Sequence, residues 1–199
     1  MLDQTQVPAS LFAKQADFAV VIDFDGTVTD IDVVDGLLVQ FARTRDWIRY
    51  ENDWTNGKIS SDFCLAKQLG EVRVGQTELI DYLKTITIDP GFLPLVKYLR
   101  EKHIPVVVLS DGFDLFIREI FRINQIKDVP FRSNVLDHEG QRLIPTFPYK
   151  DDSCRRCANC KRRTLLKYRS KVKHFVFIGD GLSDGCVIGA ADTIFAKGD

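Results

Sequence analysis

Residues 19–27 read AVVIDFDGT, and this stretch decides the expected fold. Its first four residues form an unbroken apolar run with three β-branched side chains, which is typical of a strand buried on both faces of a parallel sheet. The run stops at Asp23, and Asp25 and Thr27 follow directly. Open α/β sheets place their ligands beyond the carboxyl ends of buried strands, so a functional site is expected here.

Two later apolar runs repeat this pattern. Residues 104–109 end at Ser110, and residues 174–178 lead into Asp180. Periodicity and turn residues predict a hairpin over residues 133–147 and a short strand over residues 193–196. They also predict four helices: one that starts at Asp89, one over residues 113–122, one over residues 161–168 and one that starts at Asp184. Strands that alternate with helices predict an α/β fold with a mostly parallel sheet covered on both faces.

Residues 30–88 interrupt this alternation. Apolar side chains recur there at helical spacing in residues 33–41, 60–70 and 77–83, and no strand is expected. We therefore expect a core domain, residues 1–29 and 89–199, and a mostly helical insertion, residues 30–88.

The composition is that of an ordinary globular domain: of 199 residues, 45% are hydrophobic and 28% are charged. The net charge of −1 gives no overall field that would favour nucleic acid or an acidic membrane. The longest apolar runs fall far short of the roughly 20 residues that span a bilayer, and residues 1–15 do not resemble a signal peptide. A cytoplasmic protein that binds neither membrane nor nucleic acid is expected.

Because the carboxyl ends of parallel strands lie at one edge of a sheet, polar residues far apart in the sequence are expected to meet there. The residues concerned are Asp23, Asp25, Ser110, Asp180 and Asp184. Four carboxylates facing one cleft would repel one another and raise their own pKa values unless a cation neutralised them. The ligands are oxygens without a shell of histidines, so Mg²⁺ is expected rather than Zn²⁺.

Four segments, in this order, resemble the motifs of the haloacid dehalogenase (HAD) phosphatases. DFDGT at residues 23–27 resembles the first motif, Ser110 the second, Lys161 the third and GDGLSD at residues 179–184 the fourth. The resemblance covers most of the chain and is greatest to the phosphoserine phosphatase-like branch. It implies a Rossmann-like α/β core with a helical cap of the C1 type inserted after the first strand. Both aspartates of the first motif are present, which favours a phosphatase over a dehalogenase.

The resemblance also implies residue roles. Asp23 would be the nucleophile that carries the phosphoryl group, and Asp25 would be the general acid and then the base. The metal would be held by Asp23, the backbone of Asp25, Asp180 and Asp184. The phosphate would be held by Thr27, Ser110, the backbone amides of Asp111 and Gly112, and Lys161. The expected activity is hydrolysis of a small phosphorylated metabolite, and the alternative is a noncatalytic phosphate-binding relative.

Substrate choice is expected to lie in the insertion, because such caps close over the core and exclude water. Asp32 lies where an acidic residue meets the substrate amine in the phosphoserine phosphatase group, although an ordinary acid at a helix N-terminus is an equally good interpretation. Four aromatic residues of the insertion line a pocket or belong to its own core: Phe41, Trp47, Tyr50 and Trp54.

The segment CRRCANC, residues 154–160, directly precedes Lys161. Cysteines at this place resemble two groups: the 2-hydroxy-3-keto-5-methylthiopentenyl-1-phosphate phosphatases of methionine salvage, which the overall pattern favours, and the phosphoethanolamine/phosphocholine and thiamine-phosphate phosphatases. Phosphoserine phosphatases usually lack this cluster. Cys154, Cys157 and Cys160 are expected to be free thiols or, with His138 as a fourth ligand, a metal site.

Two features near the end of the chain complete the sequence predictions. The basic residues between Arg155 and Lys173 are a solvated helix face or steer phosphorylated substrates. The sequence stops at Asp199, shortly after the last predicted strand, whereas related enzymes continue with another helix and strand. An open sheet edge there would favour a homodimer.

Overall fold

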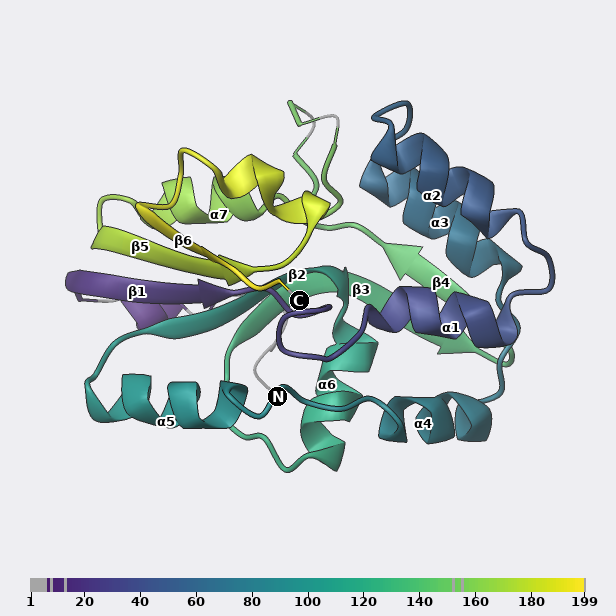
Figure 1. Ribbon diagram of the computed structural model, residues 1–199, viewed down its shortest axis with the longest axis horizontal. Coiled ribbons are helices and arrows are strands. Elements are labelled where there is room, and N and C mark those ends of the chain that lie inside the picture. Colours follow the sequence, from purple (N-terminus) through teal and green to yellow (C-terminus); the bar gives the residue numbers. More distant parts are fainter. Residues whose placement is uncertain (1–6, 8, 13, 152, 155, 199) are drawn as a thin grey trace.

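The computed structural model describes residues 7, 9–12, 14–151, 153–154 and 156–198. In this part of the chain, six strands form one sheet in the order β4-β3-β2-β1-β5-β6 (Figure 1). Neighbouring strands are parallel except β3 and β4, which form the predicted hairpin. The strands are β1 (Ala16–Ile22), β2 (Val106–Phe113), β3 (Phe131–Glu139), β4 (Arg142–Thr146), β5 (Val172–Gly179) and β6 (Thr193–Ala196). The predicted α/β fold with a mostly parallel sheet is confirmed.

Strand β1 lies between two parallel partners, which explains its apolar composition. Val20, Val21 and Ile22 pair with residues 106–108 of β2 on one side and residues 176–178 of β5 on the other. All three side chains are buried. Val20 and Ile22 join the hydrophobic cluster on one face of the sheet, and Val21 joins the cluster on the other face. The chain then leaves the sheet at Asp23, at its carboxyl edge.

Helices cover both faces of the sheet. The 3-10 helix η1 (Ala9–Phe12), helix α7 (Lys161–Tyr168) and the 3-10 helix η2 (Leu182–Val187) lie on one face. Helices α5 (Phe92–Glu101) and α6 (Asp114–Ile123) lie on the other (Figure 1). No helix among the described residues is long and apolar enough to cross a bilayer.

The region 30–88 is helical, as predicted, and contains α1 (Val33–Phe41), α2 (Trp47–Thr55), α3 (Ser61–Glu71) and α4 (Gln76–Lys84). Apolar residues of α1 and α4 share one hydrophobic cluster with α6, and Leu69 of α3 belongs to the same cluster. Helix α3 also packs against β4. Helices α2 and α3 pack on each other and extend beyond the carboxyl edge of the sheet (Figure 1). The boundary of the insertion as a separate domain stays a prediction.

The boundaries of α5 and β2 differ from the predictions. Helix α5 begins at Phe92, because Asp89 and Pro90 form a turn in which the Asp89 carboxylate accepts the Gly91 N–H at 2.8 Å. Strand β2 does not end at residue 109 but continues to Phe113, with a shift of register against β3 after Leu109. Such a bulge re-aims side chains, here at the site itself.

The predicted helices starting at Thr77 and Asp184 also differ in detail. Helix α4 begins one residue earlier, and Glu78 caps it by accepting the Gly75 N–H at 2.9 Å. The segment after Asp180 forms the short η2 instead of an α-helix over residues 184–190. Gly185 and Gly189 explain this difference, since glycine weakens a helix and Gly189 has a φ of +83°.

Candidate active site

The carboxyl edge of the sheet brings three predicted metal ligands together. Asp23 follows β1, and Asp180 and Asp184 follow β5. One carboxylate oxygen from each lies within 4.8 Å of the other two. Among the described residues, this is the one grouping of histidine, cysteine, aspartate and glutamate side chains with the spacing of metal ligands.

Asp23 is buried, with 4% of its surface exposed. Its Oδ1 accepts the backbone N–H of Phe24 and lies 2.7 Å from the Lys161 Nζ. Burial raises the pKa of Asp23 well above its ordinary value, and the neighbouring Lys161 charge only partly opposes this effect. Both of these contacts involve Oδ1.

Lys161 is an ammonium group enclosed by the protein, with only 1% of its surface exposed. As the first residue of α7, it points to the strand ends and contacts Asp23 at 2.7 Å and Asp184 at 2.5 Å. Burial alone would lower the pKa of Lys161, but the two carboxylates outweigh burial and raise it. The lysine is therefore charged, and it neutralises part of the aspartate cluster.

Asp25 is held by the insertion and by the second strand. Its Oδ1 accepts the Val33 N–H at 3.1 Å, and its Oδ2 accepts the Ser110 hydroxyl at 3.1 Å. Burial, followed by the charge of Asp32, raises the pKa of Asp25 to about 7. Gly112 leaves room for this arrangement, because a Cβ there would lie 2.6 Å from Asp25 Oδ2. A carboxyl group with such a pKa can donate and accept a proton near neutral pH.

Thr27 contacts one of the three clustered carboxylates, that of Asp180. Its hydroxyl donates to Asp180 Oδ1 at 2.7 Å. The turn that leads into Thr27 requires glycine at position 26: Gly26 has a φ of +70°, and a Cβ there would lie 2.3 Å from Asp180 Oδ2. The contact of Thr27 with a phosphate stays a prediction, whereas its hydrogen bond orients a candidate metal ligand.

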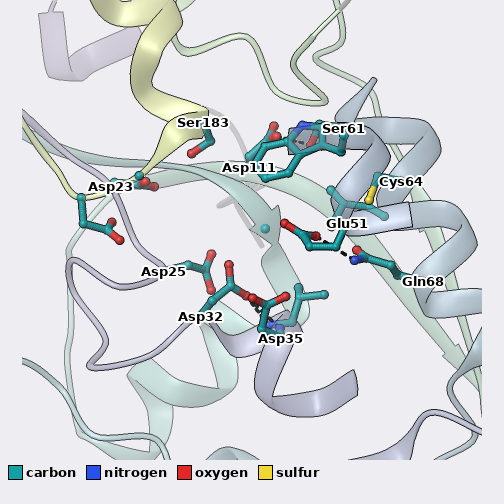
Figure 2. Close-up of a pocket in the computed structure, with 16 residues that line it drawn as sticks. Asp23, Asp25, Asp32, Asp35, Glu51, Ser61, Cys64, Gln68, Asp111 and Ser183 are labelled. Atoms are coloured by element: carbon teal, nitrogen blue, oxygen red, sulfur yellow. Dashed lines mark hydrogen bonds between the residues drawn. The ribbon is translucent and has the colours of Figure 1, made fainter. Parts of the chain in front are cut away.

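The side chains of the second motif point in two directions. The Ser110 hydroxyl donates to Asp25 and accepts the Gly112 N–H at 2.8 Å, so it lies in the centre of the site. The Asp111 carboxylate instead points to the insertion and accepts the hydroxyl of Ser61 (Figure 2). The sequence did not predict this contact, which depends on how α3 is placed.

A cavity of about 140 Å³ opens between the core and the insertion. Asp25, Asp32, Asp35 and Glu51 all line it (Figure 2). Desolvation within the cavity, followed by the charge of Asp35, raises the pKa of Asp32 to about 7. Desolvation and then Glu51 raise the pKa of Asp35 to about 6.

Asp32 also caps α1 by accepting the N–H groups of Val34 and Asp35 at 2.8 and 2.9 Å, which agrees with its interpretation as an acid at a helix N-terminus, whereas its contact with a substrate amine stays a prediction. Asp35 and Glu51 were not predicted. Their signal in the sequence is an acidic residue one turn after Asp32 and a second on the next helix. Gln68 of α3 fixes Glu51 through a hydrogen bond of 2.9 Å.

Of the four aromatic residues predicted either to line a pocket or to form the core of the insertion, Trp54 lines the cavity. Phe41 and Trp47 pack against the main hydrophobic cluster instead. The interpretation as ordinary core therefore holds for these two.

The cysteine segment packs behind Lys161. Cys157 and Cys160 are buried, and a fourth cysteine, Cys186 of η2, adjoins Cys157. A hydrogen bond from the Cys157 thiol lowers the pKa of Cys186 to about 6 and raises that of Cys157. His138, the fourth ligand in the metal-site alternative, instead hydrogen-bonds the Val74 carbonyl at 2.9 Å.

Part of the basic segment is used in surface ion pairs. Arg169 contacts Asp192 at 2.5 Å, and Lys173 contacts Asp17 at 2.7 Å. Arg155 lies outside the described residues. These pairs agree with a solvated helix face, whereas a role in steering substrates stays a prediction.

Comparison with known proteins decides the family. The family model described as "Putative Phosphatase" matches residues 18–196. The chain belongs to this family. A relative from Brevibacillus brevis, named 2-hydroxy-3-keto-5-methylthiopentenyl-1-phosphate phosphatase, is 31% identical over 180 residues, which cover 88% of this chain and 80% of the relative. Pdp3-interacting factor 1 of Schizosaccharomyces pombe is 30% identical over 197 residues, which cover 93% of this chain and 84% of that protein.

Solved structures show the same fold. Phosphoserine phosphatase from T. onnurineus matches this phosphatase family member with a TM-score of 0.70 and 20% identity over 96% of this chain and 87% of that chain. The predicted resemblance to the HAD phosphatases is confirmed, as is the prediction of a hydrolase acting on phosphoric monoesters.

Proposed function

We propose that this protein is a Mg²⁺-dependent phosphatase that transfers the phosphoryl group of a small metabolite to Asp23 and then to water. The observation that carries the proposal is the buried contact between Asp23 and Lys161 at 2.7 Å, beside a second carboxyl group, Asp25, with a pKa of about 7. The proposed nucleophile and the proposed proton carrier thus line one cavity, and the cation Lys161 contacts the nucleophile.

The acidic cluster fits Mg²⁺. Asp23, Asp180 and Asp184 supply three carboxylates within 4.8 Å, and Lys161 supplies one positive charge, so the group remains negative. Oxygen ligands of this kind suit Mg²⁺. When bound, the ion would neutralise charge on the phosphoryl oxygens.

The residues of the chain divide the work in two stages. In the first, Asp23 Oδ2 attacks phosphorus while Asp25 gives its proton to the leaving oxygen. In the second, Asp25 takes a proton from water, and this water releases phosphate from Asp23. Lys161 and the Ser110 hydroxyl would hold the phosphoryl oxygens throughout, because both lie next to the two aspartates.

The test is release of phosphate from a panel of phosphorylated metabolites, with Mg²⁺ or with EDTA, by the wild type and by Asp23→Asn. We expect Mg²⁺-dependent release that Asp23→Asn abolishes while the variant remains folded. Full activity of Asp23→Asn would contradict the aspartyl-phosphate. A folded wild type that hydrolyses nothing in the panel would favour the noncatalytic alternative.

Two substrate classes have specific support. The named activity of the Brevibacillus brevis relative supports 2-hydroxy-3-keto-5-methylthiopentenyl-1-phosphate, the substrate predicted first. The acidic wall formed by Asp32, Asp35 and Glu51 supports a phosphate ester that also carries a positive charge, such as phosphoethanolamine, phosphocholine, thiamine monophosphate or phosphoserine.

Glu51→Gln distinguishes these classes, with Glu101→Gln, on the exposed end of α5, as the matched control. For a cationic substrate we expect kcat/KM to fall by about tenfold in Glu51→Gln, since one attractive charge is lost. An unchanged kcat/KM for cationic substrates would exclude this use of the wall.

We further propose that α2 and α3 act as the cap over the site and that the protein is cytoplasmic and does not bind nucleic acid. A homodimer is proposed at the edge strand β6, whose Ile194 and Phe195 side chains are exposed. Sedimentation of the wild type and of Phe195→Glu tests the dimer.

A further inference from the structure

The Asp111 carboxylate joins two parts of the protein that are distant in sequence. Its Oδ2 accepts the hydroxyl of Ser61, the first residue of α3. Its Oδ1 accepts the backbone N–H of Asn159 at 2.5 Å, and Oδ2 lies 3.5 Å from the N–H of Ala158. The carboxylate thus lies between the cap and the loop before α7.

The loop on the core side leads directly to Lys161. Asn159 is 1% exposed, and its side-chain amide donates to the Ser110 carbonyl at 2.8 Å and the Arg132 carbonyl at 3.2 Å. Lys161 follows two residues later and contacts Asp23. The position of the lysine along α7 therefore depends on how residues 158–160 are held.

The cap meets the same loop through two more contacts. The Ser61 N–H donates to the Arg156 carbonyl at 2.9 Å, and Asp62 contacts Lys150 at 2.6 Å. Of the three links, only the one through Asp111 also includes the second motif, because Asp111 directly follows Ser110 in β2.

We propose that Asp111 is a positioning residue, whose carboxylate couples the seating of α3 to the placement of Lys161. The carboxylate acts through Ser61 on one side and the amides of residues 158–159 on the other, apart from any role of the Asp111 backbone N–H in holding phosphate. This inference rests on the proposed function for its kinetic consequence, but its structural consequence is independent of any substrate.

Asp111→Asn is the main test, because it preserves the size of the side chain but replaces one acceptor oxygen with a donor facing N–H groups. We expect kcat to fall by about 10- to 100-fold, as a displaced catalytic group would cause. Ser61→Ala removes only the cap side, so KM should rise by about three- to tenfold, with a smaller fall in kcat. Asp62→Asn, the matched control, weakens cap docking without touching Asp111 and should leave kcat closer to the wild type than Asp111→Asn does.

Amide hydrogen exchange supplies a measurement without substrate. In Asp111→Asn, residues 156–168 should exchange about tenfold faster than in the wild type or in Asp62→Asn, because the carboxylate acceptor of two loop amides is lost. The proposal is overturned if folded Asp111→Asn keeps both wild-type kcat and wild-type exchange, or if Asp62→Asn changes both equally.

Two further outcomes are decided by exchange alone. If the wild type hydrolyses no phosphate ester, the proposed function fails. Faster amide exchange in Asp111→Asn would then still support the link between α3 and the loop before α7, and unchanged amide exchange would overturn it. If Asp111→Asn does not fold, Ser61→Ala takes its place: faster exchange in residues 156–160 supports the link, and wild-type exchange there refutes it.

Discussion

Lys161→Met probes the centre of the site, because it removes the charge while nearly preserving the length of the side chain. Lys161 makes two short contacts with carboxylates, at 2.7 Å to Asp23 and 2.5 Å to Asp184, and it is almost completely buried. Removing one partner of a buried ionic group costs about 3–5 kcal/mol, since uncompensated charges are left behind. For a domain of this size that is a fall in melting temperature of roughly 6–20 °C.

The pH dependence of this loss has a definite sign. Burial already raises the pKa of Asp23, and the loss of Lys161 should raise it further. The folded state of the variant then holds a proton that the unfolded carboxyl group, with a pKa of about 4, has released. Stability therefore falls as pH rises above that value, and the deficit of Lys161→Met should be larger at pH 8 than at pH 5.

The assay is urea unfolding of wild type and variant at both pH values, with EDTA and with Mg²⁺. Added Mg²⁺ should reduce the deficit, because an ion bound to the folded state replaces the missing positive charge. Lys173→Met, which removes an exposed lysine paired with Asp17, is the control and should change stability little. Stability of Lys161→Met within about 1 kcal/mol of the wild type at pH 8 in EDTA would refute the argument.

Three further predictions concern single residues. Asp25→Asn should lower the rate of phosphate release by about 10²–10⁴-fold while the fold is kept, because a proton carrier is lost; an undiminished rate would exclude Asp25 as the acid. Gly112→Ala should lower the rate of phosphate release, since the new Cβ would lie 2.6 Å from Asp25 Oδ2. Gly70→Ala, in α3 and with open space around it, should instead raise the free energy of unfolding by about 0.5–1 kcal/mol, as measured by thermal unfolding. Asp192→Asn should cost about 1 kcal/mol at pH 7, discounted for exposure, because the hydrogen bond from Arg169 lowers the pKa of Asp192. In unfolding curves this difference should shrink progressively as pH falls from about 4, the pKa of the unfolded carboxyl group, towards the lowered pKa of the folded one.

The strands were predictable because their residues are apolar on both faces, a pattern that a buried parallel strand requires. Val20, Val21 and Ile22 read as such a strand in isolation, and their pairing on both sides agrees. The short 3-10 helix η2 was not predictable as such, because periodicity indicates a helix without distinguishing its type, and Gly185 and Gly189 weaken it. The extension of β2 to Phe113 depends on a bulge against β3, which local sequence does not encode.

The sequence by itself determined the order of the strands along the chain, the apolar faces and the acidic residues that follow β1 and β5. Those features depend on local periodicity and on the rule that parallel strands end at one edge. Only the tertiary structure decided that Asp111 points to Ser61 and that Asp35 and Glu51 face the same cavity as Asp25. These contacts join side chains across the packing of α2 and α3 over the sheet, and the geometry of such packing is set by many distant residues together.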